Sequence, residues 1–251
     1  MKTSQTILSV FALSALMASC TQQYYRPRPN DPPLLSEAGQ VKATGSLSLT
    51  GSPMVSAAWS PVRGLGVQGG FSSSRTSGFM SDGSTRNDFR ERRSLVYGGV
   101  GYYRKLSPNT LFEVYGGVGS AGFSADGTGP VSRLRMTNYY VQPAVGLVRD
   151  NLELAFSVRY DHLQRGLTRL DSSRYGLFLD GDQKFLRFQG YDLLQPGITF
   201  RAGWPEAKFH LDISESFVLN SDYESLYGDS RQNGLLRLTI GLNLSLHKLF
   251  K

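Results

Sequence analysis

The sequence predicts an all-β fold, a closed antiparallel up-and-down transmembrane β-barrel of about ten strands, within a range of about eight to twelve. Three observations predict it. From residue 40 onward, apolar and polar residues alternate with a period of two, which places alternate side chains on opposite faces of a strand. One face carries Leu, Ile, Val and Phe, and the other carries ionisable and amide side chains. Short and long connections alternate, as they do in barrels that cross a membrane.

Residues 1–19 are predicted to be a signal peptide. Lys2 supplies a positive charge, and residues 7–16 form an apolar stretch that is followed by small residues, the pattern of a secretory leader. This stretch is too short to span a membrane as a helix. The sequence Leu16-Met17-Ala18-Ser19-Cys20 resembles the lipobox of bacterial lipoproteins, although Met17 is a less usual choice at its position.

The lipobox resemblance implies that Cys20 carries acyl chains and is the first residue of the mature protein. Cys20 is the only cysteine, so a disulfide within the chain is excluded, and a buried free thiol is the alternative. Two or more acyl chains hold a protein firmly on one leaflet. Residues 20–39 are therefore predicted to be a lipidated N-terminus and a proline-rich tether, because prolines favour an extended spacer over packed structure.

Residues 40–251 are predicted to form the barrel. Most of the expected strands reach the ~9 to 11 residues that a tilted strand needs to cross a bilayer, but residues 53–60 fall short. Glu215 is the main misfit, since it falls on an apolar face, where a β-bulge or an interfacial depth would accommodate it. The expected strands cover residues 40–50, 53–60, 64–74, 93–104, 110–124, 136–148, 152–161, 194–202, 208–219 and 236–247. The last one is expected to face outward with Leu236, Leu238, Ile240, Leu242, Leu244 and Leu246.

The connections predict the orientation of the barrel. The long ones are expected at residues 75–91, 125–134, 165–189 and 220–233, and membrane barrels place long loops outside and short turns in the periplasm. An even number of strands then puts both chain ends in the periplasm, with Cys20 anchored in the inner leaflet. Aromatic residues near the short turns, such as Tyr103 and Trp204, are expected to form an interfacial girdle.

The pattern over residues 40–251 resembles the small outer-membrane β-barrel families, especially those of Bacteroidota-like bacteria. The match is one of architecture and includes no diagnostic motif. Residues 242–250 also resemble the signal that the barrel assembly machinery reads, although Phe250 is penultimate rather than final. The resemblance implies an outer-membrane location in a Gram-negative cell and insertion by that machinery.

The polar face is expected to fill the lumen with a charge network. An isolated buried charge is costly, so these side chains are expected to pair with one another. About ten strands leave little free passage, which disfavours an open general porin. The residues expected in this network are Lys42, Glu113, Glu153, Arg159, Asp161, Arg201, His210, Asp212 and Arg237.

Two residue pairs raise an enzymatic alternative. Asp161 and His162 are similar to the Asp/His pair of ten-stranded outer-membrane proteases, but adjacent strand residues point to opposite faces. His210 and Asp212 share the inward face, but they begin a strand at the periplasmic side and have no assigned nucleophile. A structural hydrogen bond is the simpler interpretation, so no catalytic residue is expected. Three histidines and one cysteine give no convincing metal ligand set, and no cofactor is expected.

Basic residues gather in the predicted outer loops, and the net charge is +7. Guanidinium groups suit the phosphates of lipopolysaccharide, whereas nucleic acid is not an expected partner at that location. An ordinary solvated loop is the alternative interpretation. The residues expected to contact lipopolysaccharide are Arg90, Arg92, Arg93, Arg165, Arg169 and Arg174.

The leading functional hypothesis is a structural or interaction barrel lipoprotein, a subunit of a larger outer-membrane assembly with other outer-membrane proteins as partners. The alternatives are a narrow or gated conduit and a surface hydrolase of the outer-membrane protease type. The sequence identifies no cargo, substrate or specific partner.

Overall fold

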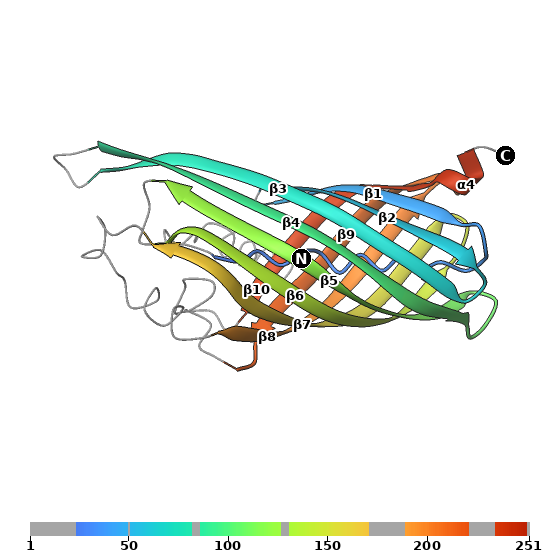
Figure 1. Cartoon of the computed structure of the whole chain (residues 1–251). Helices are drawn as coiled ribbons and strands as arrows, with labels where there is room; N and C mark the ends of the chain where they lie inside the picture. Colours follow the sequence, from blue (N-terminus) through green and yellow to red (C-terminus); the bar gives the residue numbers. More distant parts are fainter. Residues whose placement is uncertain are drawn as a thin grey trace, which may run out of the picture.

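The computed structural model describes residues 24–49, 51–81, 86–126, 131–170, 189–220 and 234–249. Within them the chain forms ten antiparallel strands that close into one barrel, because β1 pairs with both β2 and β10 (Figure 1). The strands are β1 (Val41–Ser48), β2 (Pro53–Val62), β3 (Leu65–Ser81), β4 (Arg86–Lys105), β5 (Thr110–Asp126), β6 (Val131–Val148), β7 (Leu152–Leu170), β8 (Gly190–Gly203), β9 (Ala207–Val218) and β10 (Gly234–Ser245). A single helical turn, α4 (Leu246–Leu249), follows β10.

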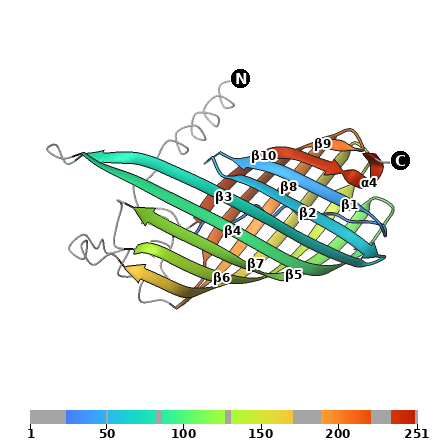
Figure 2. The ribbon, with the colours of Figure 1, turned by 45° about the horizontal axis from the view of Figure 1, so that its top comes forward.

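The two ends of the barrel differ in their connections. The short-turn end carries residues 63–64, 106–109, 149–151 and 204–206, together with the start of β1 and α4. The other end, termed the long-loop end, carries residues 51–52, the last residues of β3, β5, β7 and β9, and the first residues of β4, β6, β8 and β10. Figure 2 shows the strands tilted to the barrel axis, with β3 and β4 extending far beyond the other strands at the long-loop end.

The outer wall of the barrel is apolar. On β10, Leu236, Ile240 and Leu242 are 41 to 57% exposed, whereas Thr239 and Asn243 are buried. The same alternation holds on β7 and β8, where the exposed side chains are Leu154, Phe156, Tyr160, Leu194, Ile198 and Phe200. A contiguous apolar surface of this kind is rare on soluble proteins. The prediction that the strands turn their leucines outward is confirmed.

Glycines on the inner face make room for tyrosines. Gly101 lies opposite Tyr115 and Gly70 lies opposite Tyr97 in the strand ladders. A methyl group on Gly70 would lie 2.6 Å from a carbon of the Tyr97 ring, far inside the distance at which two carbons attract. These glycines therefore let large side chains fill the inside of the barrel.

Two of the expected long connections are wrong. Residues 75–91 belong mostly to β3 and β4, which stay paired as far as Ser81 and Arg86. Residues 125–134 lie mostly in β5 and β6, so only residues 127–130 connect them. Backbone hydrogen bonds sustain a ladder without apolar alternation. The alternation that marks lipid-facing strands therefore stops before the strands do.

Smaller differences concern single positions. Glu215 pairs with Leu236 in a ladder without a register shift, so its depth near the end of β9 accommodates it, and no bulge does. Tyr103 points into the lumen and its hydroxyl lies 2.7 Å from the Ser60 hydroxyl, so it is not part of a girdle. Leu246 begins α4 instead of ending β10. No helix in the described part of the chain is long and apolar enough to cross a membrane.

A charge placed on the outer wall should destabilise the barrel in phospholipid vesicles. Ile198 is 51% exposed on the outer wall of β8. Ile198→Arg is expected to lower the free energy of unfolding by about 2 to 4 kcal/mol, the cost of an arginine near the bilayer midplane. Ser94→Arg, at an exposed polar position farther toward the long-loop end, is the control and is expected to cost about 1 kcal/mol or less. Guanidinium titrations of tryptophan fluorescence measure both, and equal losses would contradict a lipid-facing wall.

Candidate functional site

Residues 24–36, termed the N-terminal segment, run through the lumen. The segment begins with Tyr24, which lies among residues near the long-loop end, and it runs toward the short-turn end, where the chain enters β1 (Figure 1). Arg28 and Asn30, halfway along it, are 2% and 1% exposed. The segment therefore occupies the lumen from one end of the barrel to the other.

This path differs from the solvated tether that the sequence predicts. The segment is extended as expected, since residues 25–36 form neither helix nor strand, but it is packed inside the barrel. Asp31 and Leu34 have φ angles of 37° and 53°, which are uncommon for residues other than glycine. Such conformations persist where surrounding contacts hold them. The lumen therefore fixes the path of the segment.

Lumen cations bind the backbone carbonyls of the segment. Arg159 donates to the carbonyls of Arg28 at 2.6 Å and Pro29 at 2.9 Å. Three more cations donate in the same way, Arg201 to Pro32 at 2.6 Å, Lys42 to Leu34 at 3.0 Å, and Arg237 to Pro27. Hydrogen bonds from charged donors are about twice as strong as neutral ones. The segment is thus held by its main chain as well as by its side chains.

The prolines explain why cations suit this segment. Four of the seven residues 27–33 are proline, which has no N–H group and favours an extended chain without internal hydrogen bonds. The segment therefore presents mainly acceptors. Three of its N–H groups meet wall carboxylates, since Asp212 accepts from Asn30 and Asp31 at 3.4 Å each and Glu113 accepts from Leu34 at 2.9 Å.

Glu153 is the centre of the network near the short-turn end. Its carboxylate accepts from Lys42 at 3.0 Å, from Arg201 at 2.7 Å and from Lys208 at 2.8 Å. Arg201 also binds Asp31 of the segment at 2.7 Å. All these side chains are at most 7% exposed. Ionised groups can be buried here because each one faces an opposite charge.

A second network surrounds Arg159 deeper in the barrel. Its guanidinium group binds Asp161 at 2.8 Å and Gln195 at 2.5 Å. Asp161 also accepts from Asn138 at 2.9 Å. Arg159 and Asp161 are both 0% exposed, so this pair is fully compensated within the wall and by the segment.

Arg28 of the segment lies between two tyrosine rings. Its guanidinium carbon is 3.8 Å from the centroid of the Tyr97 ring and 4.2 Å from that of Tyr140. A guanidinium group over an aromatic face is attracted by the ring, the more so when both are desolvated. The tyrosines that the inner glycines accommodate thus hold the segment at mid-depth.

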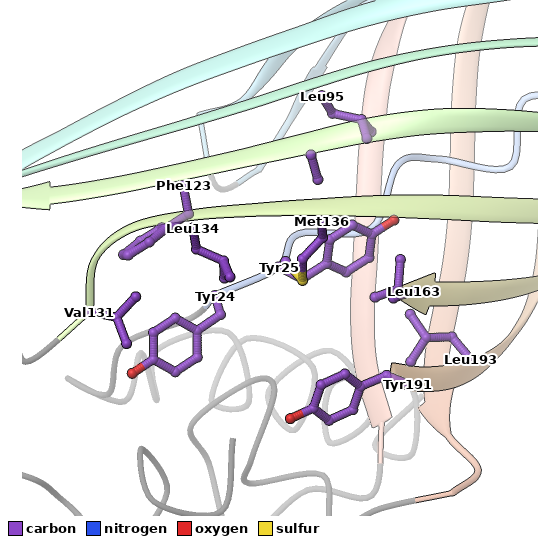
Figure 3. Packing of buried hydrophobic residues seen from close by; sticks show 11 residues of the cluster. Tyr24, Tyr25, Leu95, Phe123, Val131, Leu134, Met136, Leu163, Tyr191 and Leu193 are labelled. Carbon is purple, nitrogen blue, oxygen red and sulfur yellow. The ribbon is translucent and has the colours of Figure 1, made fainter. Parts of the chain in front are cut away.

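Apolar contacts hold the segment at both ends. Tyr24 and Tyr25 pack in a cluster that includes Phe123 and Tyr191 near the long-loop end, and Figure 3 shows the two residues of the segment among the labelled wall residues of this cluster. The rings of Tyr24 and Phe123 meet edge to face with centroids 5.7 Å apart. Leu34 and Leu35 pack in a second cluster nearer the short-turn end, with Ala58, Tyr103, Leu111 and Ala155.

The nine residues expected in the lumen network lie on the inner side of the barrel. Arg237 is half-buried and the other eight are at most 5% exposed. Sequence reasoning missed Lys208, although it shares the inward parity of His210 and Asp212. It also missed the whole contribution of the segment, above all Arg28 and Asp31.

In the two residue pairs considered as catalytic candidates, the histidines lie close to other acidic residues. The His162 side chain is 44% exposed and its Nδ1 lies 2.8 Å from Asp192, while Asp161 is buried in the lumen. His210 is buried with its Nδ1 3.7 Å from Asp31, and the segment occupies the space beside it. Neither pair therefore forms a site open to a substrate. Among the described residues, no group of three or more His, Cys, Asp or Glu side chains could hold a metal ion.

The arginines expected to contact lipopolysaccharide do not all lie on the outer surface of the barrel. Arg90, Arg92 and Arg169 are exposed, and Arg165 is half-buried. Arg93 points toward the lumen, where it binds Glu91 at 2.6 Å, so its expected outward role is wrong. The strand parity that extends through residue 93 turns it inward. Arg174 and the expected lipidation site Cys20 lie outside the described residues.

Comparisons with known proteins give no family. No protein-family model matches the sequence, and no curated protein matches it. Among solved structures, the chain is similar to the outer-membrane expressed OmpT of Vibrio cholerae, with 11% identity over 83% of this chain and 62% of that one, and a TM-score of 0.37. It therefore spans about six tenths of that protein. Two Acinetobacter baumannii structures also match: CarO with 11% identity over 82% of this chain and 97% of that one (TM-score 0.32), and CarO2 with 10% identity over 84% of this chain and 100% of that one (TM-score 0.32).

Glu153→Gln should destabilise the folded barrel, because it leaves three buried cations without their shared counter-charge. We expect the free energy of unfolding to fall by about 3 to 5 kcal/mol, as when one partner of a buried ion pair is removed. Glu37→Gln is the control, since the Glu37 and Lys105 side chains are 69% and 42% exposed and an exposed pair contributes about 1 kcal/mol or less. Unfolding titrations in detergent micelles measure both variants. Similar small losses of unfolding free energy in the two variants would contradict the role of Glu153 as the shared counter-charge of three buried cations.

Proposed function

We propose that the chain is an outer-membrane β-barrel lipoprotein whose own N-terminal segment closes its lumen, and that it is a structural or interaction component of an outer-membrane assembly. The observation that carries this proposal is the buried path of residues 24–36 through the barrel. A lumen occupied by the chain itself leaves neither a through-passage nor an open site for a substrate. The proposal therefore favours neither an enzyme nor an open pore.

The surface of the barrel supports a membrane location. Closure of the sheet satisfies the backbone groups of every strand pair, which hydrocarbon requires. Trp59, Tyr102 and Trp204, near the short-turn end, are 51 to 76% exposed, and such residues favour a membrane interface. Strand-spanning proteins of this kind in Gram-negative bacteria reside in the outer membrane. The apolar wall and the aromatic residues thus favour that membrane.

The contacts of the segment favour a permanent closure over a gate. A gate has to leave the lumen, and this segment could leave only by breaking the carbonyl contacts of Arg159 and Arg201. Departure would also strip Tyr25 and Leu35 of their apolar partners. Buried donors left without acceptors each cost about 1 to 3 kcal/mol. A gated conduit is the alternative, and conductance separates the two.

The path of the segment also bears on the lipid anchor. Cys20 precedes Tyr24 by four residues, which is about 14 Å of extended chain. Tyr24 lies near the long-loop end, and long loops of outer-membrane barrels face outward. An acylated Cys20 would therefore anchor in the outer leaflet, on the cell surface, rather than in the inner leaflet that a free tether would reach.

Removing the segment should open the barrel. In planar bilayers the full mature chain is expected to give no regular single-channel steps, whereas a variant that lacks residues 24–35 is expected to give stable open steps through the polar lumen. A synthetic peptide of residues 24–36, added from the side of the long loops, is expected to close them again. A peptide of the same composition in scrambled order is the control.

Regular conductance from the full chain would favour the gated conduit. A silent deletion variant that runs as a folded, heat-modifiable band in gel electrophoresis would show that the wall side chains alone close the lumen. The variant Tyr24→Ser with Tyr25→Ser, which keeps the chain length, is expected to give intermittent openings if the segment is the seal.

Surface display tests the direction of the segment. A short epitope tag inserted after Gln22 is expected to be accessible to antibody on intact cells, whereas the same tag after Lys251 is expected to be accessible only after the outer membrane is permeabilised. Palmitate labelling that is lost in Cys20→Ala tests the acylation itself. An N-terminal tag that is hidden on intact cells would contradict a surface anchor.

A further inference from the structure

A row of arginines crosses the outer wall toward the long-loop end. Arg75 of β3 lies directly opposite Arg92 of β4, and Arg133 of β6 lies directly opposite Arg169 of β7. Ser124 of β5 links the two pairs, because it lies opposite both Arg92 and Arg133. All four arginines are exposed. The row is therefore continuous over five neighbouring strands.

The row places like charges side by side. Like charges directly opposite each other in an antiparallel ladder are destabilising, and this row contains two such pairs. Among the described residues, no carboxylate forms an ion pair with Arg75, Arg92, Arg133 or Arg169. A bound anion would convert both repulsive pairs into favourable contacts.

The same part of the wall is hollowed. A shallow surface pocket of about 350 Å³ lies where β4, β5, β6 and β7 meet the long-loop end. Asp126, opposite Arg90, is the one acidic residue in its lining. Its other lining residues include Arg90, Arg92, Arg133, Arg169 and Ser124. Four guanidinium groups and the hydroxyl group of Ser124 around one pocket suit the oxygens of a phosphate group.

The position of the row suits a lipid headgroup. Arg92 lies four residues beyond Val96 on β4, and Arg133 lies six residues beyond Tyr139 on β6, where Val96 and Tyr139 are exposed on the apolar wall. These intervals correspond to about 13 to 20 Å along a tilted strand. Arginine side chains can extend back toward the interface with their apolar stems on the wall. The guanidinium groups thus lie above the hydrocarbon, at the level of headgroups.

We propose that this row binds an outer-leaflet glycolipid that carries two phosphate monoesters on a rigid headgroup, the chemistry of the lipid A part of lipopolysaccharide. The proposal rests on the outer-membrane location proposed above. Arg92 and Arg133 are two strand spacings apart, about 10 Å, so the two halves of the row can each hold one phosphate of the same headgroup. A lipid with a single phosphodiester fits only one half. The site includes Arg133, which the expectation drawn from the loops did not.

Binding by the purified full-length barrel tests the site. The probes are bis-phosphorylated lipid A, lipid A that lacks one phosphate, and phosphatidylglycerol, each titrated in detergent micelles and measured by native mass spectrometry. The wild type is expected to bind bis-phosphorylated lipid A at least tenfold more tightly than either other lipid. The double variant Arg92→Gln with Arg133→Gln is expected to lose at least tenfold in that affinity. Arg104→Gln, an exposed arginine at the short-turn end of β4, is the matched control and is expected to change it less than twofold.

Equal affinity of the wild type and the double variant would overturn the site, and so would an equal loss in Arg104→Gln. Equal binding of phosphatidylglycerol would assign the row to anionic lipid surfaces in general and overturn the choice of lipid. Displacement of lipid A by millimolar inorganic phosphate would also overturn the choice of lipid. Arg169→Gln serves as a second variant, and heat modifiability in gels checks that each variant is folded. Cell fractionation tests the membrane location separately, and conductance tests the closed lumen, so a failure of either is distinguishable from a failure of this site.

Discussion

The structure depends on the compensation of buried charge by the N-terminal segment. Arg159 and Arg201 are fully buried inside the barrel, and each binds both a wall carboxylate and backbone carbonyls of the segment. Without the segment, these guanidinium groups would keep only part of their hydrogen bonds in a narrow lumen. Without the arginines, a proline-rich main chain would lack donors for its carbonyls. Wall and segment therefore complement each other, and the charge networks of the lumen include groups from residues 24–36.

The wall of the barrel could be predicted from the sequence, because the environment on each side of a strand acts on every second residue. Because the outer side is apolar and the inner side is polar, the pattern predicts which residues from Leu236 to Leu242 face outward and which from Glu153 to Asp161 face inward. The path of the segment could not be predicted in this way, since it has no periodicity. The signal that was available is the pair Tyr24-Tyr25 and the pair Leu34-Leu35. Large apolar residues at both ends of a supposed solvated spacer indicate that the spacer is buried.

The arginine row shows a different limit of sequence reasoning. Parity within a strand predicts which face a residue occupies, but the pairing of Arg133 with Arg169 depends on the register between strands. The register between β6 and β7 shifts twice, between Val131 and Arg133 and again between Leu134 and Met136. Such irregularities change which residues are opposite each other. The prediction of loops at residues 75–91 and 125–134 is wrong for a related reason. The parts of a strand that extend beyond the hydrocarbon need no apolar face, so they lack the alternation that identifies a strand.

The dimensions of the segment connect its composition to its place in the barrel. Residues 24–35 span about 34 Å as an extended proline-rich chain, close to the ~30 Å thickness of a bilayer core. The apolar pairs at its two ends meet apolar clusters of the wall, and the polar residues between them meet the charged networks. Moving the segment along the barrel axis would take Tyr25 and Leu35 out of these apolar clusters. The same contacts that close the lumen thus set the register of the segment, and with it the end of the barrel at which residue 24 emerges.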